Sequence, residues 1–193
     1  MTVIFSYIGL LFAITIHEFS HAYAADRLGD PTPRAMGRLT LNPLAHLDPI
    51  GTLMIFIAHF GWGKPVPIDP YNFKNPRRDE IIVALAGPIS NIILGSTIGI
   101  ISLTTGYFNE ILYIIAIVNF SLAVFNLIPI PPLDGSKVFL NLMPVEKAYE
   151  WEKAFERYGF FIVAACLFLP IGGSNIINII VSPIVYYISN LFF

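Results

Sequence analysis

Two histidines and a glutamate near the start of the sequence have the types and spacing of a metal-binding hydrolytic site. His17 and His21 are four residues apart, and Glu18 follows the first histidine in a His-Glu-x-x-His pattern. On a helix, positions i and i+4 lie on one face, so both imidazoles can bind one metal ion with the glutamate beside the water position. Ionisable groups inside a membrane helix cost roughly 2.5–3.5 kcal/mol each, which favours a function for them. The alternative is a histidine pair at the cytoplasmic end of a helix, with Glu18 solvated.

A hydrolytic zinc site needs a third protein ligand and an open position for water. Asp134 is the best candidate, because it directly follows the apolar stretch 111–130 and is expected near the same membrane face as the histidines. Two prolines shortly before it and a glycine after it describe a rigid turn that can hold a carboxylate in one place. The alternative is an ordinary Asp-Gly turn residue.

The composition indicates a membrane protein. The chain has 193 residues, of which 55% are hydrophobic and 12% charged, whereas a typical soluble domain carries about 25% charged residues. Its net charge is −2 and it has no basic cluster, so we expect no nucleic-acid partner. The length predicts a single domain over residues 1–193. The apolar start of the chain lacks a positively charged n-region and is expected to be a retained helix. One cysteine, Cys166, leaves the redox compartment open.

The apolar stretches predict an all-α polytopic membrane protein. A helix of about 20 residues crosses a hydrocarbon core of ~30 Å. Stretch 50–60 is too short to cross and fits a re-entrant or interfacial segment, while 145–158 is charged and amphipathic and predicts a surface helix. In the loop 26–80 we expect a small membrane-associated β element, with short strands at 38–41 and 64–68. The five apolar segments are 2–25, 81–103, 111–130, 160–171 and 176–193.

Lysine and arginine in the loops predict the orientation in the membrane. Loops 26–80 and 131–158 carry the chain's basic residues, and the turns 105–110 and 170–175 carry none. We therefore expect both charged loops and the active site on the cytoplasmic side, with the N-terminus outside.

The sequence resembles the site-2 protease family of intramembrane zinc metalloproteases. The His-Glu-x-x-His motif, the segment Asn-Leu-Ile-Pro-Ile-Pro-Pro-Leu-Asp-Gly at 126–135 and the element Gly-Pro-Ile-Ser-Asn at 87–91 carry the resemblance, which extends over about residues 9–142. It implies one zinc ion held by His17, His21 and Asp134, with Glu18 as the general base and Asn126 near the substrate or the oxyanion. Segments 41–49 and 63–67 look like those of compact prokaryotic members, and the chain departs from larger members in having no PDZ or CBS domain.

We therefore expect an endopeptidase that cuts within or near transmembrane segments of other membrane proteins, in a prokaryotic cell membrane. Its partners are then protein substrates and the lipid bilayer, and the sequence leaves the oligomeric state open. Two alternatives are a metal or proton transporter and a catalytically inactive, chaperone-like relative. A transporter does not need Glu18 between the histidines, and the chain shows no inverted repeat.

Three further residues give weaker signals. His46 and Asp48 are candidates for a second metal site, with a gate for the zinc or a cap for the re-entrant segment as the alternatives. For Asn91 the favoured interpretation is a hydrogen bond between helices.

Overall fold

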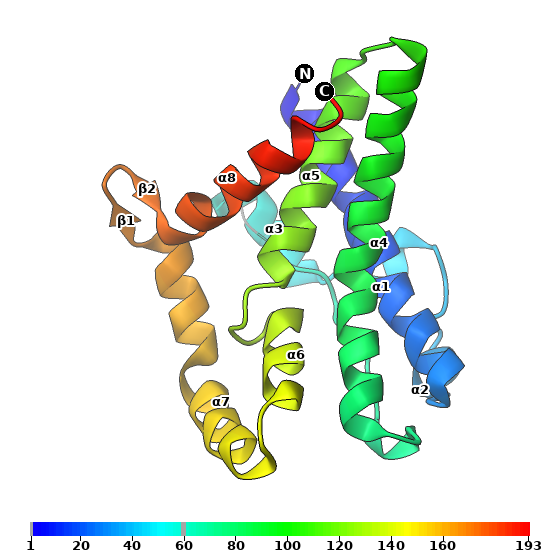
Figure 1. Cartoon of the computed structure of the whole chain (residues 1–193), viewed down its shortest axis with the longest axis vertical. Helices are drawn as coiled ribbons and strands as arrows, with labels where there is room; N and C mark the ends of the chain where they lie inside the picture. The colour runs from blue at the N-terminus through cyan, green and yellow to red at the C-terminus, as the bar shows by residue number, and fades with distance from the viewer. Residues whose placement is uncertain (1, 59–60) are drawn as a thin grey trace.

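The computed structural model describes residues 2–58 and 61–193, and within them the protein is mostly helical (Figure 1). This confirms the predicted all-α class. Two 3₁₀ turns, η1 (Pro43–Ala45) and η2 (Pro70–Asn72), and a hairpin of two-residue strands, β1 (Pro170–Ile171) and β2 (Ser174–Asn175), complete the described structure. The helices are α1 (Thr2–Leu28), α2 (Thr32–Ala35), α3 (Pro49–Ala58), α4 (Pro76–Thr105), α5 (Glu110–Asn126), α6 (Asp134–Leu142), α7 (Val145–Phe168) and α8 (Ile176–Ser189).

Helices α1, α4 and α5 form the central layer, because α1 packs against both of the others and these two pack against each other. Gly106 ends α4 in the left-handed conformation at φ 65°, which glycine adopts without steric cost. Asn109 then begins α5, since its side chain accepts hydrogen bonds from the first free backbone N–H groups of that helix. The short turn 106–109 therefore places α4 and α5 antiparallel (Figure 1).

Close packing in this layer depends on small residues facing large ones. Phe120 of α5 is fully buried, and a Cβ atom added at Gly95 of α4 would lie 2.6 Å from its Cε1 atom. Helix α8 closes the same core with Ile177, Val181 and Val185, which are all buried.

Within the described part of the chain, two helices, α1 and α4, are long and apolar enough to cross a membrane. The predicted count of five apolar segments is not confirmed. Helices α5 and α8 are apolar but have 17 and 14 residues, or roughly 25 and 21 Å at 1.5 Å per residue. The stretch 145–158 and most of the stretch 160–171 are joined in the single helix α7, whose first half is charged, and the second stretch ends in strand β1.

The predicted β element in the loop 26–80 is wrong. Among the described residues of this loop, the sheet-like pairing is one isolated bridge between Leu47 and Gly63. Segment 64–68 contains Pro65 and Pro67, which have no N–H to donate to a neighbouring strand. The carbonyls of Lys64 and Pro65 instead accept hydrogen bonds from the guanidinium group of Arg38. A buried side chain thus takes the place of a partner strand. The two short strands lie near the C-terminus instead, where Gly172 and Gly173 form their turn at positive φ.

Polar side chains shape the rest of this loop. Asp48 caps α3 by accepting a hydrogen bond from the backbone N–H of Gly51 at 2.7 Å. This agrees with the predicted alternative in which Asp48 caps the re-entrant segment. The fully buried carboxylate of Asp30 accepts hydrogen bonds from the backbone and side-chain N–H groups of Thr32, Asp69 and Asn72. Burial alone raises the pKa of Asp30, but these hydrogen bonds outweigh it, so the pKa lies below its ordinary value.

Candidate metal centre

The structure brings the three predicted metal ligands together. Helix α1 places His17 and His21 one turn apart on a buried face, where their exposed fractions are 4% and 6%. Asp134 is the first residue of α6. Its Oδ2 atom lies 3.0 Å from Nε2 of His17 and 3.2 Å from Nε2 of His21. Residues 117 positions apart in the chain therefore meet at one point.

The other ring nitrogen of each histidine faces an oxygen atom on α4. Nδ1 of His17 lies 2.6 Å from Oδ1 of Asn91, and Nδ1 of His21 lies 2.7 Å from the carbonyl oxygen of Val83. Each oxygen is an acceptor, so each Nδ1 carries a proton and donates it. In a neutral imidazole this leaves the Nε2 lone pair free to bind a metal ion. Both lone pairs point toward Asp134.

These three atoms fit a zinc ion. They all lie within 4.8 Å of one another, and at zinc–ligand distances of roughly 2.0–2.1 Å two tetrahedral ligand atoms are about 3.3 Å apart. Three acceptor atoms this close repel one another unless a cation or a proton lies between them. Burial alone raises the pKa of Asp134, but the charge of protonated His21 and the hydrogen bonds that His17 and His21 donate in their protonated forms outweigh it. The pKa of Asp134 is therefore well below its ordinary value, and the ionised form is the one that binds metals.

Gly87 of α4 makes room for the two imidazoles. A Cβ atom at this position would lie 2.4 Å from Nε2 of His21 and 2.7 Å from Nε2 of His17. Both distances are far below van der Waals contact, so α4 approaches the metal-binding atoms as closely as only glycine permits.

Glu18 lies beside the histidines and is held by the loop 26–80. Its Oε2 atom accepts a hydrogen bond from the backbone N–H of Val66 at 3.0 Å. Arg38 fixes the segment that supplies this N–H. Arg38 is 95% buried, and its guanidinium group donates to the carbonyl of Pro65 at 2.9 Å and to that of Lys64. We call residues 63–66 the strap, because they lie between Arg38 and Glu18.

His46 supports the strap and is not part of the cluster of metal-binding side chains found among the described residues. It is fully buried, its Nε2 donates to the carbonyl of Thr40 at 2.7 Å, and its Nδ1 accepts from Arg38 at 3.4 Å. Its own backbone carbonyl accepts from the N–H of Lys64 at 2.8 Å. With both ring nitrogens in use, His46 has no free ligand atom. Asp48 is used as a helix cap, so the described residues form no second metal site with this pair.

Two asparagines were singled out in the sequence. Asn126, at the end of α5, donates from Nδ2 to the carbonyl of Leu122 at 2.9 Å, and its role near the substrate stays a prediction. Asn91 makes the expected hydrogen bonds between helices and also contacts His17. This contact was not predicted from the sequence. The spacing of four residues between Gly87 and Asn91 on one helix is the signal that places both beside the histidines.

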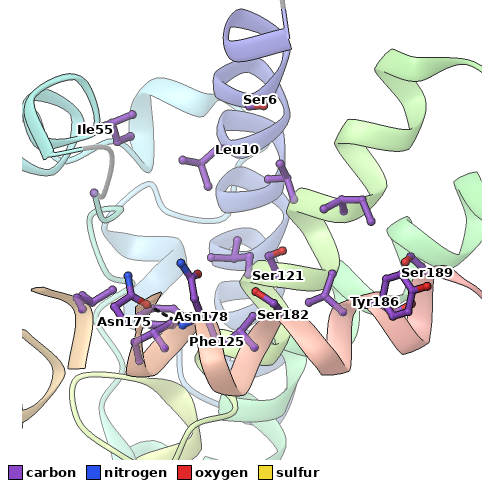
Figure 2. Close-up of a pocket in the computed structure, with 18 of the residues that line it drawn as sticks. Ser6, Leu10, Ile55, Ser121, Phe125, Asn175, Asn178, Ser182, Tyr186 and Ser189 are labelled. Atoms are coloured by element: carbon purple, nitrogen blue, oxygen red, sulfur yellow. Dashed lines mark hydrogen bonds between the residues drawn. The ribbon is translucent and has the colours of Figure 1, made fainter. Parts of the chain in front are cut away.

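A cavity of about 830 Å³ lies between α1, α5 and α8 (Figure 2). On α1 it is lined by Ser6 and Leu10, and Leu10 is two turns before His17. On α5 it extends to Phe125, the neighbour of Asn126. Figure 2 shows polar side chains along an otherwise apolar wall, among them Ser121, Ser182, Ser189, Asn175 and Asn178.

Comparison with known proteins agrees with this geometry. Residues 102–170 match the family described as peptidase family M50. YwhC of Bacillus subtilis, a candidate zinc metalloprotease, is 39% identical over 178 residues, which cover 86% of this chain and 80% of YwhC. Rip2 of Mycolicibacterium smegmatis, also a candidate zinc metalloprotease, is 32% identical over 173 residues, which cover 84% of this chain and 66% of Rip2.

A zinc metalloprotease of Methanocaldococcus jannaschii is 25% identical over 187 residues, covering 94% of this chain but 47% of the relative. No solved structure is significantly similar to the chain. The match to YwhC extends over most of both proteins. The chain therefore belongs to the site-2 protease, or M50, family of zinc metalloproteases.

Proposed function

We propose that this protein is an intramembrane endopeptidase that hydrolyses peptide bonds within or near transmembrane segments of other membrane proteins. The observation that carries the proposal is the meeting of His17, His21 and Asp134 beside Glu18, on a helix long and apolar enough to cross a membrane. His17, His21 and Asp134 hold the zinc ion in this proposal. Zinc polarises the scissile carbonyl and lowers the pKa of water.

Glu18 is the proposed general base. Among the described residues it accepts one hydrogen bond, at Oε2 from Val66. This fixes the carboxylate and leaves Oε1 for proton transfer. In the proposed reaction, Oε1 takes a proton from the attacking water and later delivers it to the leaving amine.

Asn126 is the proposed donor to the substrate carbonyl. A carboxamide has two N–H donors, and the hydrogen bond to Leu122 uses one of them. The second can stabilise the negative charge that develops on the carbonyl oxygen.

The cavity between α1, α5 and α8 is the proposed place for the substrate segment. Leu10 and His17 are seven positions apart on α1, which is roughly 10 Å along the helix axis at 1.5 Å per residue. A helix hides its peptide bonds, so the substrate must unwind before it is cut. Polar side chains on the cavity wall, such as Ser121 and Ser182, offer partners to a backbone that has lost its helical hydrogen bonds.

The proposed cellular location is the prokaryotic cell membrane, with the active site toward the cytoplasm and the N-terminus outside. Figure 1 shows the start of α4 and the junction of α6 with α7 at one end of the molecule, and the turn 106–109 at the other. The first end holds the loops rich in lysine and arginine, which favours its cytoplasmic placement.

The test compares the wild type with Glu18→Gln in liposomes that contain a single-pass substrate, and measures bound zinc and cleavage together. We expect both proteins to bind one zinc ion and the variant to lose cleavage by about 10²–10⁴-fold, the usual contribution of a general base. Zinc-loaded wild type that cuts no substrate but moves zinc across the liposome would show a transporter instead. Zinc binding with neither activity would favour the chaperone-like alternative.

A further inference from the structure

A chain of buried amides connects α5 to the metal centre through α4. Asn119 of α5 and Asn91 of α4 are both fully buried. Nδ2 of Asn91 donates to Oδ1 of Asn119 at 2.9 Å, and Oδ1 of Asn91 accepts from Nδ1 of His17 at 2.6 Å. Within the described structure Asn119 makes no direct hydrogen bond to the three metal-binding side chains, and Asn91 lies between it and His17.

Backbone carbonyls at two points set the direction of this chain. Nδ2 of Asn119 donates to the carbonyl of Ile115 at 2.8 Å, which turns its Oδ1 atom toward Asn91. Nδ2 of Asn91 donates to that oxygen and also to the carbonyl of Ala13 at 3.0 Å. A carbonyl oxygen only accepts, so a flip of the Asn91 amide would place its Oδ1 against two other oxygens.

The direction of the amides selects the tautomer of His17. As Asn91 offers an oxygen, Nδ1 of His17 must carry the proton, and Nε2 keeps the lone pair that faces Asp134. If Asn91 were flipped, its N–H would select the opposite tautomer, which has a proton on Nε2 and cannot bind zinc there. His21 differs, because a backbone carbonyl, that of Val83, fixes its tautomer directly.

We infer that Asn119 is a positioning residue for zinc, which acts through Asn91 to keep His17 in the metal-binding tautomer. The inference rests on the proposed role of His17 as a zinc ligand. It also distinguishes the two histidines. The tautomer of His17 depends on side chains from two other helices, whereas that of His21 depends only on the backbone of α4.

The test is a matched pair of substitutions in the full-length protein, Asn119→Leu and Asn119→Asp. Both replacements have nearly the shape of asparagine, but only aspartate keeps an oxygen that accepts from Asn91. The zinc dissociation constant is measured in detergent by competition with a coloured chelator. We expect it to rise about 10-fold for Asn119→Leu, the lower end of the usual effect for a residue behind a metal ligand, and to stay near the wild-type value for Asn119→Asp.

A second measurement separates positioning from mere packing. The ¹⁵N resonances of the imidazole of His17 in the zinc-free protein report which nitrogen carries the proton. We expect the wild type and Asn119→Asp to show a proton on Nδ1, and Asn119→Leu to show a shift toward Nε2. A packing role alone would lower thermal stability without moving these resonances.

A double substitution tests the route through Asn91. Asn91→Ala removes the amide that links Asn119 to His17. We therefore expect Asn119→Leu to have no further effect on zinc affinity in the Asn91→Ala background. If Asn119→Leu does not fold, Asn119→Val removes the same oxygen with a smaller side chain and replaces it in every comparison.

The outcomes are distinct. Wild-type zinc affinity and an unchanged His17 resonance in Asn119→Leu, or in Asn119→Val, would overturn the inference and leave the proposed function standing. A wild-type protein that binds no zinc would instead overturn the metal centre on which the proposed function depends.

Discussion

The close approach of Gly87 to the two histidines gives the sharpest test of the metal centre. A Cβ atom in Gly87→Ala would lie 2.4 Å from Nε2 of His21, about 1 Å short of an ordinary contact at 3.4 Å. The methyl group must push the imidazole aside or move α4 away from α1. Metal–ligand distances tolerate only about 0.2 Å, and a misplacement of 1 Å costs enzymes on the order of 100-fold in rate. We expect zinc affinity and cleavage each to fall by about 100-fold or more.

The fold itself should survive this substitution. Alanine is favoured over glycine inside a helix by about 1 kcal/mol, so α4 gains intrinsic stability where the site is lost. Two other glycines supply controls. Gly95→Ala meets Phe120 at 2.6 Å and should reduce thermal stability while zinc affinity is kept, and Gly9→Ala meets Ile115 at an ordinary 3.4 Å and should change neither.

The assay is chelator competition for zinc affinity, with circular dichroism for thermal stability on the same preparations. Wild-type zinc affinity in Gly87→Ala would refute the reasoning, since the methyl group has no other place to go. Equal losses of affinity in Gly87→Ala and Gly95→Ala would also refute it, because zinc binding would then follow helix packing in general.

Two further predictions concern the loop 26–80. Arg38→Met leaves two carbonyls of the strap without their donor, so the strap should no longer hold Glu18, and cleavage should fall about 10-fold or more with zinc content unchanged. Among the described residues the exposed Arg34 pairs with Asp26, and its removal should have little effect in the same assays. Equal activity of the two arginine variants would contradict the role of the strap. The lowered pKa of Asp30 stabilises the folded state above the unfolded pKa of about 3.9, and this contribution is lost as pH falls through the folded value. The melting temperature of the wild type should therefore exceed that of Asp30→Asn at pH 7 and approach it below pH 4, and a constant difference across this range would count against the hydrogen-bonded carboxylate.

The parts of the site that follow from local geometry were predictable from the sequence. Two histidines four residues apart on a helix must share a face, so the position of His17 beside His21 needed no tertiary information. Asp134 could be predicted as the third ligand because few residues of the chain qualify for that position and the turn before it is rigid. Asn91 was assigned only a hydrogen bond between helices, since an asparagine that bonds a neighbouring helix and one that orients a histidine look the same in sequence.

The loop 26–80 shows where the sequence was insufficient. Segments 38–41 and 64–68 have residue patterns typical of short strands. Whether a strand forms, however, depends on a hydrogen-bonding partner that sequence periodicity does not identify. Here the partner is the side chain of Arg38, drawn inward against the usual preference of a guanidinium for solvent. The number of membrane crossings was uncertain for a related reason. Helix α7 is long enough to cross a membrane, but its charges are confined to its first half. The apolar run that follows them was too short to be assigned as a membrane crossing by itself.

The late position of Asp134 in the chain has a consequence for the cell that makes this protein. The ribosome synthesises His17, Glu18 and His21 long before Asp134, the third ligand, which lies 117 positions after the first histidine. In between, α4 must be made to supply Asn91 and Val83, and α5 must be in place before the turn can carry Asp134 back to α1. A half-made chain in the translocation machinery thus has a base but an incomplete ligand set. If the proposed function holds, the protein stays inactive toward the newly inserted helices around it until most of its own sequence has been synthesised.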